Sequence, residues 1–186
     1  MANALRVNAV SVVMADAYGP PLAAIFQQAV TNGITLSQME YVRNVATSQS
    51  PVSAGAILAC NVMILDALAA EGWIVSNTTF VSRNDVEATR QVINAAFAPA
   101  EETIADSMDA TGYLAVLSLH AAIGYHLTLT AQPLPLMLNY AFAASYPSLV
   151  VAQKLYADAS RADELREEND VIHPAFMPLT GQALSS

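Results

Sequence analysis

LMLNYAFAASYPSLVVAQKLYADASRADELREENDVIHPAFMPLTGQAL, residues 136–184, is the stretch that decides the fold of the C-terminal part. Its first eight residues alternate in polarity, include aromatic side chains and lie between prolines, which predicts a β-strand. Pro147 is placed to begin a helix over 147–158, and Ser160 to cap a second, polar helix over 159–170. A Pro-rich loop then leads to a short strand near 182–184. The order predicts a small βααβ subdomain over residues 134–186.

The preceding residues 1–133 are dominated by helical patterns, so the fold class is mainly α: a helical bundle followed by the βααβ subdomain. Residues 50–73, SPVSAGAILACNVMILDALAAEGW, predict a central helix, with Ser50 as N-cap, Pro51 at its first position and Gly72 at its end. Ser82 and Asp85 resemble a capping box at the start of another helix, which Pro99 is expected to kink or restart.

A third long helix is predicted from about residue 110 to 130. The pattern over residues 1–51 is softer. A helix is expected to end at Asn32 and Gly33, and Thr35 or Ser37 to cap the next one.

The chain has few charges for a globular protein. It is 54% hydrophobic and 12% charged, and residues 111–153 contain no Asp, Glu, Lys or Arg. Residues 111–130 are long enough to cross a bilayer, but they carry His120, His126 and several hydroxyls and lack flanking basic residues. We therefore expect no membrane span, and expect neighbouring subunits to cover the apolar surface. The N-terminus has no convincing cleavage site, so we expect it to be mature sequence.

The charge balance argues against nucleic acid as a partner. The formal net charge is −9, and the seven basic residues are scattered along the chain, whereas phosphate binding depends on clustered Lys and Arg. The one cysteine, Cys60, excludes an internal disulfide and lies among apolar residues typical of a core.

Several acids and histidines could form chemical sites, but each group also has a simpler interpretation. The acids of residues 163–170 share helix faces but alternate with Arg161 and Arg166, which is typical of a solvated helix rather than a metal site. His120 and His126 fall on different faces of a helix, and each is more simply a hydrogen-bonded buried or interface histidine. His173 precedes a proline in a loop and could be a turn or contact residue.

No nucleophile motif or phosphate loop occurs, and the acid pairs Glu101–Glu102 and Asp106–Asp109 have no surroundings that would tune them for catalysis. We therefore expect neither an enzyme nor a bound metal or cofactor.

Residues 149–184 resemble the C-terminal end of the DNA-circulation (DNA-circularisation) proteins of Mu-type phage tails. That family has a Leu-Val-Leu-Ala-x-x-Leu-Tyr-Gly-Asp-Ala-Ser-Arg-x-Asp-Glu-Leu run, followed by Asn and by His-Pro-Gly-Phe-x-Pro. The positions of this chain that match are Leu149, Val150, Ala152, Leu155, Tyr156, Asp158, Ala159, Ser160, Arg161, Asp163, Glu164, Leu165, Asn169, His173, Pro174, Phe176 and Pro178. Ala157 and Ala175 stand where the family has glycine, which implies slightly altered turns. Asp170 and Ile172 stand where the family tends to have basic residues.

The βααβ ending also resembles a LysM module, a fold that binds peptidoglycan and that phage baseplates reuse as a protein clamp. The resemblance implies a virion component of a contractile tail, at the baseplate hub or the tube-proximal ring. It would assemble in the host cytoplasm as a symmetric homo-oligomer with other tail proteins. A peptidoglycan-binding module is the alternative, and a membrane-associated helical protein is a third interpretation. The residues expected at the protein interface are Tyr146, Leu155, Tyr156, Arg161, Asn169, His173, Pro174 and Phe176.

Overall fold

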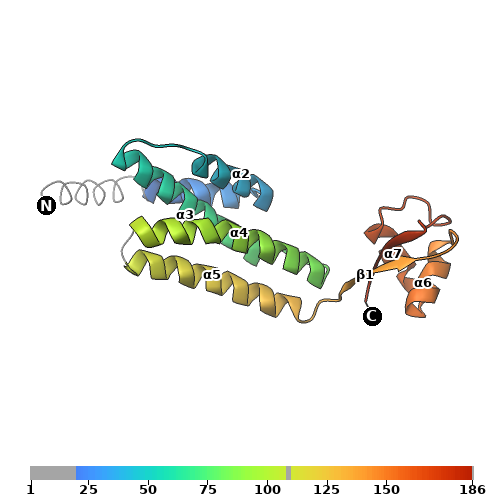
Figure 1. Cartoon of the computed structure of the whole chain (residues 1–186). Helices are drawn as coiled ribbons and strands as arrows, with labels where there is room; N and C mark the ends of the chain where they lie inside the picture. Colours follow the sequence, from blue (N-terminus) through green and yellow to red (C-terminus); the bar gives the residue numbers. More distant parts are fainter. Residues whose placement is uncertain (1–19, 108–109, 186) are drawn as a thin grey trace, which may run out of the picture. The chain divides into compact units, whose positions relative to one another are not determined.

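The computed structural model describes residues 20–107 and 110–185 of the chain (Figure 1). Its contacts divide the chain into two compact units. The bundle unit contains Met1–Thr79 and Thr89–Thr128, and the C-terminal unit contains Phe80–Ala88 and Leu129–Ser186. The architecture is mainly helical with a small two-stranded antiparallel sheet near the C-terminus, as the sequence predicts.

The bundle unit begins with a helix over residues 20–31, followed by α2 (Leu36–Thr47). Asn32 and Gly33 form the turn that follows the first helix, and the φ of 81° at Gly33 is readily adopted by glycine. Thr35 caps α2 in a capping box: its hydroxyl accepts from the Gln38 amide at 3.3 Å, and the Gln38 side chain accepts from the Thr35 amide at 2.9 Å. Both predicted signals are therefore confirmed.

α3 (Ala54–Ser76) is the predicted apolar helix, but its ends differ from those expected. Its N-cap is Ser53, whose hydroxyl accepts from the Ala56 amide at 3.2 Å, so the prediction of Ser50 as N-cap was wrong. Gly72 lies inside the helix and is buried. A methyl group there would come within 2.6 Å of Cδ1 of Ile123, so Gly72 permits close packing on α5 and does not end the helix.

α4 (Arg83–Ser107) and α5 (Ala110–Ala131) complete the long helices. The predicted box at the start of α4 is confirmed: the Asp85 amide donates to the Ser82 hydroxyl at 3.2 Å, and the Ser82 amide donates to Asp85 Oδ2 at 3.0 Å. Because Pro99 lies within α4, the helix does not restart there. The side chains of Asp106 and Asp109 lie outside the described residues.

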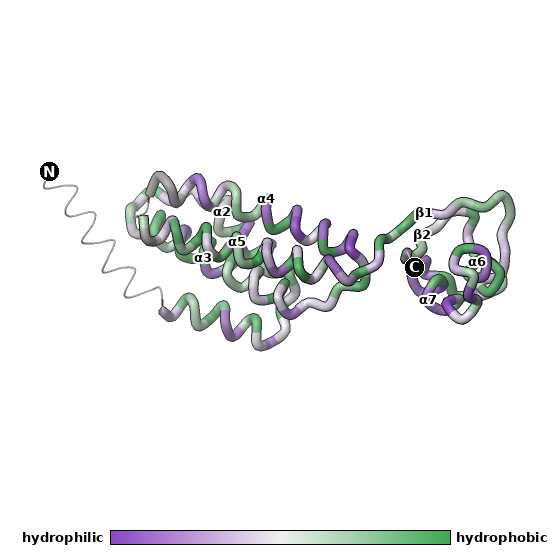
Figure 2. The backbone as a smooth tube through the Cα atoms, turned by 90° about the horizontal axis from the view of Figure 1, so that it is seen from below, coloured by the Kyte–Doolittle hydropathy of each residue, from purple (hydrophilic) through white to green (hydrophobic). Residues whose placement is uncertain are grey.

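Two apolar helices are the main hydrophobic elements of the bundle unit. Ala54–Ser76 and Gly112–Ala131 are both long and apolar enough to cross a membrane by length and composition alone, and Figure 2 shows hydrophobic residues along them. Only 22% and 17% of their most apolar windows are buried within the protein. The expectation of no membrane span was based on residues 111–130, which lie in α5, the second of these helices. It stays a prediction.

The C-terminal unit has the predicted βααβ order. β1 (Met137–Ala141) pairs antiparallel with β2 (Thr180–Leu184), with Met137 opposite Leu184 and Ala141 opposite Thr180. Between them lie α6 (Ser148–Tyr156), the 3-10 turn η1 (Ala159–Arg161) and α7 (Ala162–Glu168). The core of this unit comprises Tyr140, Val151, Ala152, Ala162, Leu165, Met177 and Ala183.

Two details of this unit differ from the predictions. Ser160 does not cap the second helix: it lies in η1, where Asp158 Oδ1 accepts from the Ser160 amide at 2.9 Å, and α7 has no side-chain cap. The unit also extends beyond the predicted boundary at residue 134. Arg83 joins it by donating from its amide to the Pro135 carbonyl and from its guanidinium to the Ala131 and Gln132 carbonyls.

Candidate interaction surface

Two loops of the C-terminal unit, residues 142–147 and 169–179, lie side by side, and we call them the loop pair. The Phe142 amide donates to the Leu179 carbonyl at 2.7 Å, and the Met177 amide donates to the Tyr146 carbonyl at 3.0 Å. The Ser145 hydroxyl adds a bond to the Met177 carbonyl at 2.7 Å. These bonds hold both loops in one conformation, so their side chains form a prearranged surface.

The loop pair presents large apolar side chains to solvent. Ile172 is 98% exposed and Phe176 is 71% exposed, and Leu179 is also exposed. The first turn of α6 adds Leu149 and Val150, next to the Ser148 amide that donates to the Pro174 carbonyl at 2.7 Å. Exposed apolar groups on a fixed backbone favour contact with another macromolecule.

His173, Pro174 and Phe176 are the exposed members of the predicted interface set. Nδ1 of His173 accepts from the Ala175 amide at 3.2 Å, and its ring lies 5.5 Å from that of Phe176. The His173 side chain is thus oriented by its own turn and stands beside the exposed phenylalanine ring.

Tyr146, Leu155 and Tyr156 are half-buried against the core of the C-terminal unit. The Lys154 ammonium lies 3.7 Å from the centroid of the Tyr146 ring, and the Arg161 guanidinium lies 3.8 Å from that of Tyr156. We call these half-buried side chains and their two cations the internal frame of the C-terminal unit. This frame supports the loops.

Arg161 and Asn169 also make internal bonds. Arg161 donates to both oxygens of Glu164, from Nε to Oε2 at 3.0 Å and from Nη2 to Oε1 at 2.6 Å. Asn169 donates to the carbonyls of Leu165 and Gln182 and accepts from the Gln182 amide at 2.8 Å, which ties α7 to β2. The structure therefore brings the predicted residues into one unit, with some on its surface and others inside its frame.

The acid-rich helix α7 is a solvated element. Asp163 pairs with Arg166 at 3.1 Å across one helical turn, and Arg161 pairs with Glu164. Among residues 20–107 and 110–185, no three His, Cys, Asp or Glu side chains lie together as metal ligands would. The two ion pairs with arginine agree with the interpretation of α7 as a solvated helix.

His120 of α5 makes contacts with three side chains of α4. Its Nδ1 lies 2.7 Å from Glu101 Oε1, its Nε2 lies 2.9 Å from Asn94 Oδ1, and its ring stacks on Phe97 at 4.6 Å. The predicted hydrogen-bonded histidine is confirmed. Since both ring nitrogens have partners, His120 fixes the register of α5 against α4.

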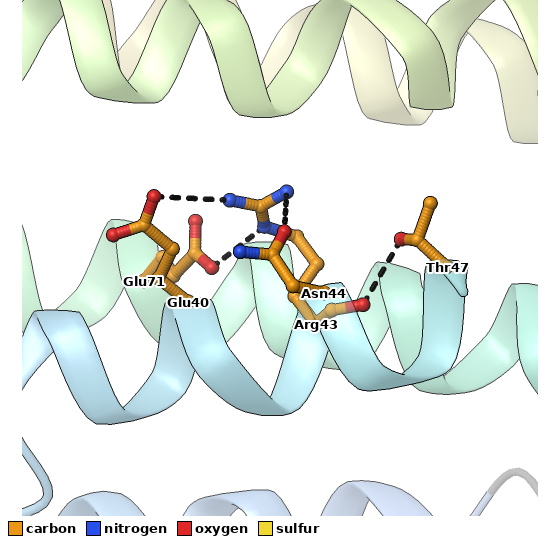
Figure 3. A network of polar contacts seen from close by, with 5 residues as sticks. All are labelled: Glu40, Arg43, Asn44, Thr47 and Glu71. Carbon is orange, nitrogen blue, oxygen red and sulfur yellow. Dashed lines mark hydrogen bonds and ion pairs between the residues drawn. The ribbon is translucent and has the colours of Figure 1, made fainter.

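A buried ion pair, which was not predicted from the sequence, links α2 and α3 (Figure 3). Nε of Arg43 donates to Oε1 of Glu71 at 2.8 Å, and the guanidinium also reaches Asn44 at 3.3 Å and Glu40 at 3.9 Å. Burial raises the pKa of Glu71, and Arg43 offsets part of that rise. Glu71 and Asp66 are the two charged residues of the mainly apolar α3, and a charge in such a helix was the signal that could have indicated a buried partner.

Comparison of the sequence with protein-family models and with curated proteins gave no match. The phage-tail and LysM resemblances therefore stay predictions, supported by the residues that carry them.

Proposed function

We propose that this protein is a structural component of a contractile bacteriophage tail, at the baseplate hub or the tube-proximal ring. In this role it holds neighbouring subunits together and performs no catalysis. Its location is the virion, after assembly in the host cytoplasm. The observation that carries the proposal is the loop pair, which presents Ile172, Phe176 and Leu179 within the segment that resembles the tail family.

The internal frame of the C-terminal unit supports a docking role. The half-buried Tyr146 and Tyr156 are covered by cations, and Asn169 fixes α7 to β2. A surface that is ordered before it binds loses less conformational entropy on docking than a flexible one. This unit therefore suits a clamp that binds a preformed neighbour.

A peptidoglycan-binding module is the second candidate. The βααβ order and the exposed ring pair of His173 and Phe176 favour it, because sugars stack on exposed rings. The surrounding side chains favour a protein partner instead. Ile172, Leu149 and Val150 are aliphatic, and they offer a glycan no hydrogen bonds for its hydroxyls.

The first test is localisation. Cryo-EM of virions that carry this protein, compared with virions bearing a small tag on it, should place the extra density at the baseplate or the tube-proximal ring. Density in the capsid, or the absence of the protein from purified tails, would overturn the proposal.

The second test separates protein docking from glycan binding. Phe176→Ser should reduce recovery of the protein in assembled tails, whereas Leu138→Ser, an exposed apolar residue of β1 outside the loop pair, should not. Purified peptidoglycan should retain neither variant nor the parent chain. Retention that disappears on truncation after Pro133 would favour the glycan-binding alternative.

A further inference from the structure

A cavity of about 450 Å³ lies in the bundle unit between the first helix and α3. Pockets that bind small molecules measure about 300–1,000 Å³, so its size suits such a ligand. Phe26 and Val30 line it from the first helix, and Asp66, Ala70 and Trp73 line it from α3. On each helix these positions are three or four residues apart, so each set belongs to one helix face. The cavity is therefore formed by the facing sides of two neighbouring helices.

The wall of this cavity is held in place by the core of the bundle unit. Phe26 and Ala70 are buried in one hydrophobic cluster with Met39 and Ala67. Trp73, by contrast, is 54% exposed, so it lies where the cavity opens to solvent. A ligand that enters beside Trp73 meets a wall that is already ordered, and it loses little free energy to rearrangement.

Asp66 is the only charged residue among the described residues that line the cavity. Its Oδ2 atom is buried and has no hydrogen-bond partner. The other acid of α3, Glu71, is bonded to Arg43, whereas no Lys or Arg of the described residues pairs with Asp66. Burial raises the pKa of the Asp66 carboxyl, and no paired cation offsets the rise. Since an unpaired buried acceptor is costly, a cationic donor that reaches it gains both a hydrogen bond and a charge pair.

We propose that the cavity binds a small hydrophobic primary amine, whose ammonium group contacts Asp66 and whose apolar body extends toward Trp73. The ammonium supplies three N–H donors and the positive charge that complements the Asp66 carboxylate. Trp73 follows Asp66 by seven residues, which corresponds to about 10 Å along the helix axis. A ring or alkyl chain of that reach packs on Phe26 and Ala70, and its far end meets the indole. The inference concerns the bundle unit and does not rest on the proposed function.

The lining of the cavity disfavours other classes of ligand. An anion would face the Asp66 carboxylate and find no basic side chain among the described lining residues. A sugar would need several partners for its hydroxyls, but the remaining polar side chains of the described lining are those of Gln27 and Thr31. Both are exposed, and the Thr31 hydroxyl already donates to the Gln27 carbonyl at 2.9 Å. A single cation on an apolar body therefore fits the cavity best.

Fluorescence of Trp73, the only tryptophan of the chain, tests the proposal with 3-phenylpropylamine as the probe. Titration of the full chain should give a saturable change in emission. Asp66→Asn keeps the shape of the side chain but removes its charge, so it should weaken binding by roughly tenfold or more. The matched control is Glu102→Gln, which removes an exposed carboxylate of α4 and should leave the affinity unchanged. Circular dichroism should show equal helix content in all three proteins.

Analogues of the probe identify the group that is recognised. 3-Phenyl-1-propanol and 3-phenylpropanoate have the same ring and chain without the ammonium, so the affinity for each should be lower by roughly tenfold or more. Nα-acetyl-lysine amide carries the same ammonium on a peptide, and it should also bind more weakly, because its amide groups would be buried against Phe26 and Ala70 without hydrogen bonds. Equal affinity for the lysine derivative would overturn the assignment to a small amine and would indicate a lysine side chain of a partner protein.

Filling the cavity gives a second test that leaves Asp66 in place. Ala23 lines the cavity, so Ala23→Phe should abolish binding, whereas Ala24→Phe, at an exposed neighbour outside the lining, should not. Two results would overturn the proposal. One is a parent chain whose emission shows no saturable change up to about 10 mM probe, well above a millimolar dissociation constant. The other is equal affinity of the parent and Asp66→Asn for the probe.

Discussion

In the part of the chain that the structure describes, Ala157 and Asp170 are the non-glycine residues with positive φ, and alanine fits this conformation less well than aspartate. Ala157 ends α6 in the left-handed region, with φ of 57°, where a Cβ atom clashes with the backbone. The phage-tail family has glycine at the corresponding position, so the departure noted in the sequence coincides with a position that glycine fits better.

Ala157→Gly should therefore stabilise the C-terminal unit by about 1 kcal/mol, because glycine removes the left-handed penalty. Ala175→Gly is the matched control. It alters the other alanine that stands where the family has glycine, but Ala175 has no positive φ, so glycine there should only add unfolded-state entropy. The stability of both variants is measured by urea denaturation monitored by amide exchange of α6. An equal gain in the two variants would contradict this account.

Glu71 shows what the sequence could not reveal about the bundle core. Its partner Arg43 is 28 residues away, and no local pattern links them. Glu71 is fully buried and its Oε2 has no hydrogen-bond partner in the structure. A buried carboxylate with one oxygen unpaired pays a desolvation cost that a single arginine only partly offsets.

Stability should therefore depend on pH through Glu71. Its pKa is raised in the folded protein above the ordinary value of 4.5, so the folded state holds this proton more tightly than the unfolded state. The resulting stabilisation is fully present below pH 4.5 and is lost as pH rises through the folded pKa. Glu71→Gln cannot titrate and should remove this part of the pH dependence.

The measurement is urea unfolding at several pH values from about 4 upward. It is monitored by the fluorescence of Trp73, the chain's one tryptophan, which lies on the same helix as Glu71. Because other acids also titrate, the informative quantity is the difference between variant and parent at each pH. A difference that does not change with pH would contradict the assignment.

Local sequence patterns located the helices and strands better than they located their ends. Thr35 with Gln38 and Ser82 with Asp85 were recognisable because a capping box depends only on neighbours in sequence. The predicted roles at helix ends were wrong for Ser50, Gly72 and Ser160, because several serines or glycines near a helix end fit the same pattern. Contacts distant in sequence, such as Gly72 with Ile123, then decide between them.

The α3–α5 contact can be tested at Gly72. Gly72→Ala gains about 1 kcal/mol of helix propensity, but its methyl group would lie 2.6 Å from Ile123 Cδ1, and overpacking costs about 1–3 kcal/mol. We expect a net loss of about 1 kcal/mol in thermal or urea unfolding. In an Ile123→Val background, which removes Cδ1, the same substitution should be close to neutral. A loss of equal size in both backgrounds would show that the overlap is not the cause.

The candidate interface was only partly predictable from sequence. The resemblance marked the segment, but it could not separate Phe176, which is exposed, from Asn169, whose side chain bonds internally to α7 and β2. That distinction depends on which side chains the packing of α6, α7 and the sheet encloses. The exposed Ile172 and Leu179 belong to the same loop and were missed because single apolar residues in a loop are common.

For the whole molecule, the charge balance gives a prediction about nucleic acid. With 7 basic and 16 acidic residues, the net charge of −9 repels phosphate. Despite the name of the family it resembles, the purified chain should not shift a labelled DNA duplex in a gel at neutral pH and low salt. A basic DNA-binding domain serves as the positive control. A salt-sensitive shift would contradict the prediction.

The two strands of the C-terminal unit have a practical consequence for handling the protein. The Leu136 amide donates to the Ser185 hydroxyl at 2.9 Å and the Ser185 amide donates to the Leu136 carbonyl at 2.7 Å, so the chain enters and leaves this sheet at the same end. The loop pair begins at the other end, about 16 Å away along five-residue strands. A fluorophore or affinity handle fused after the last strand therefore emerges on the side away from Phe176, and can report on docking without blocking it.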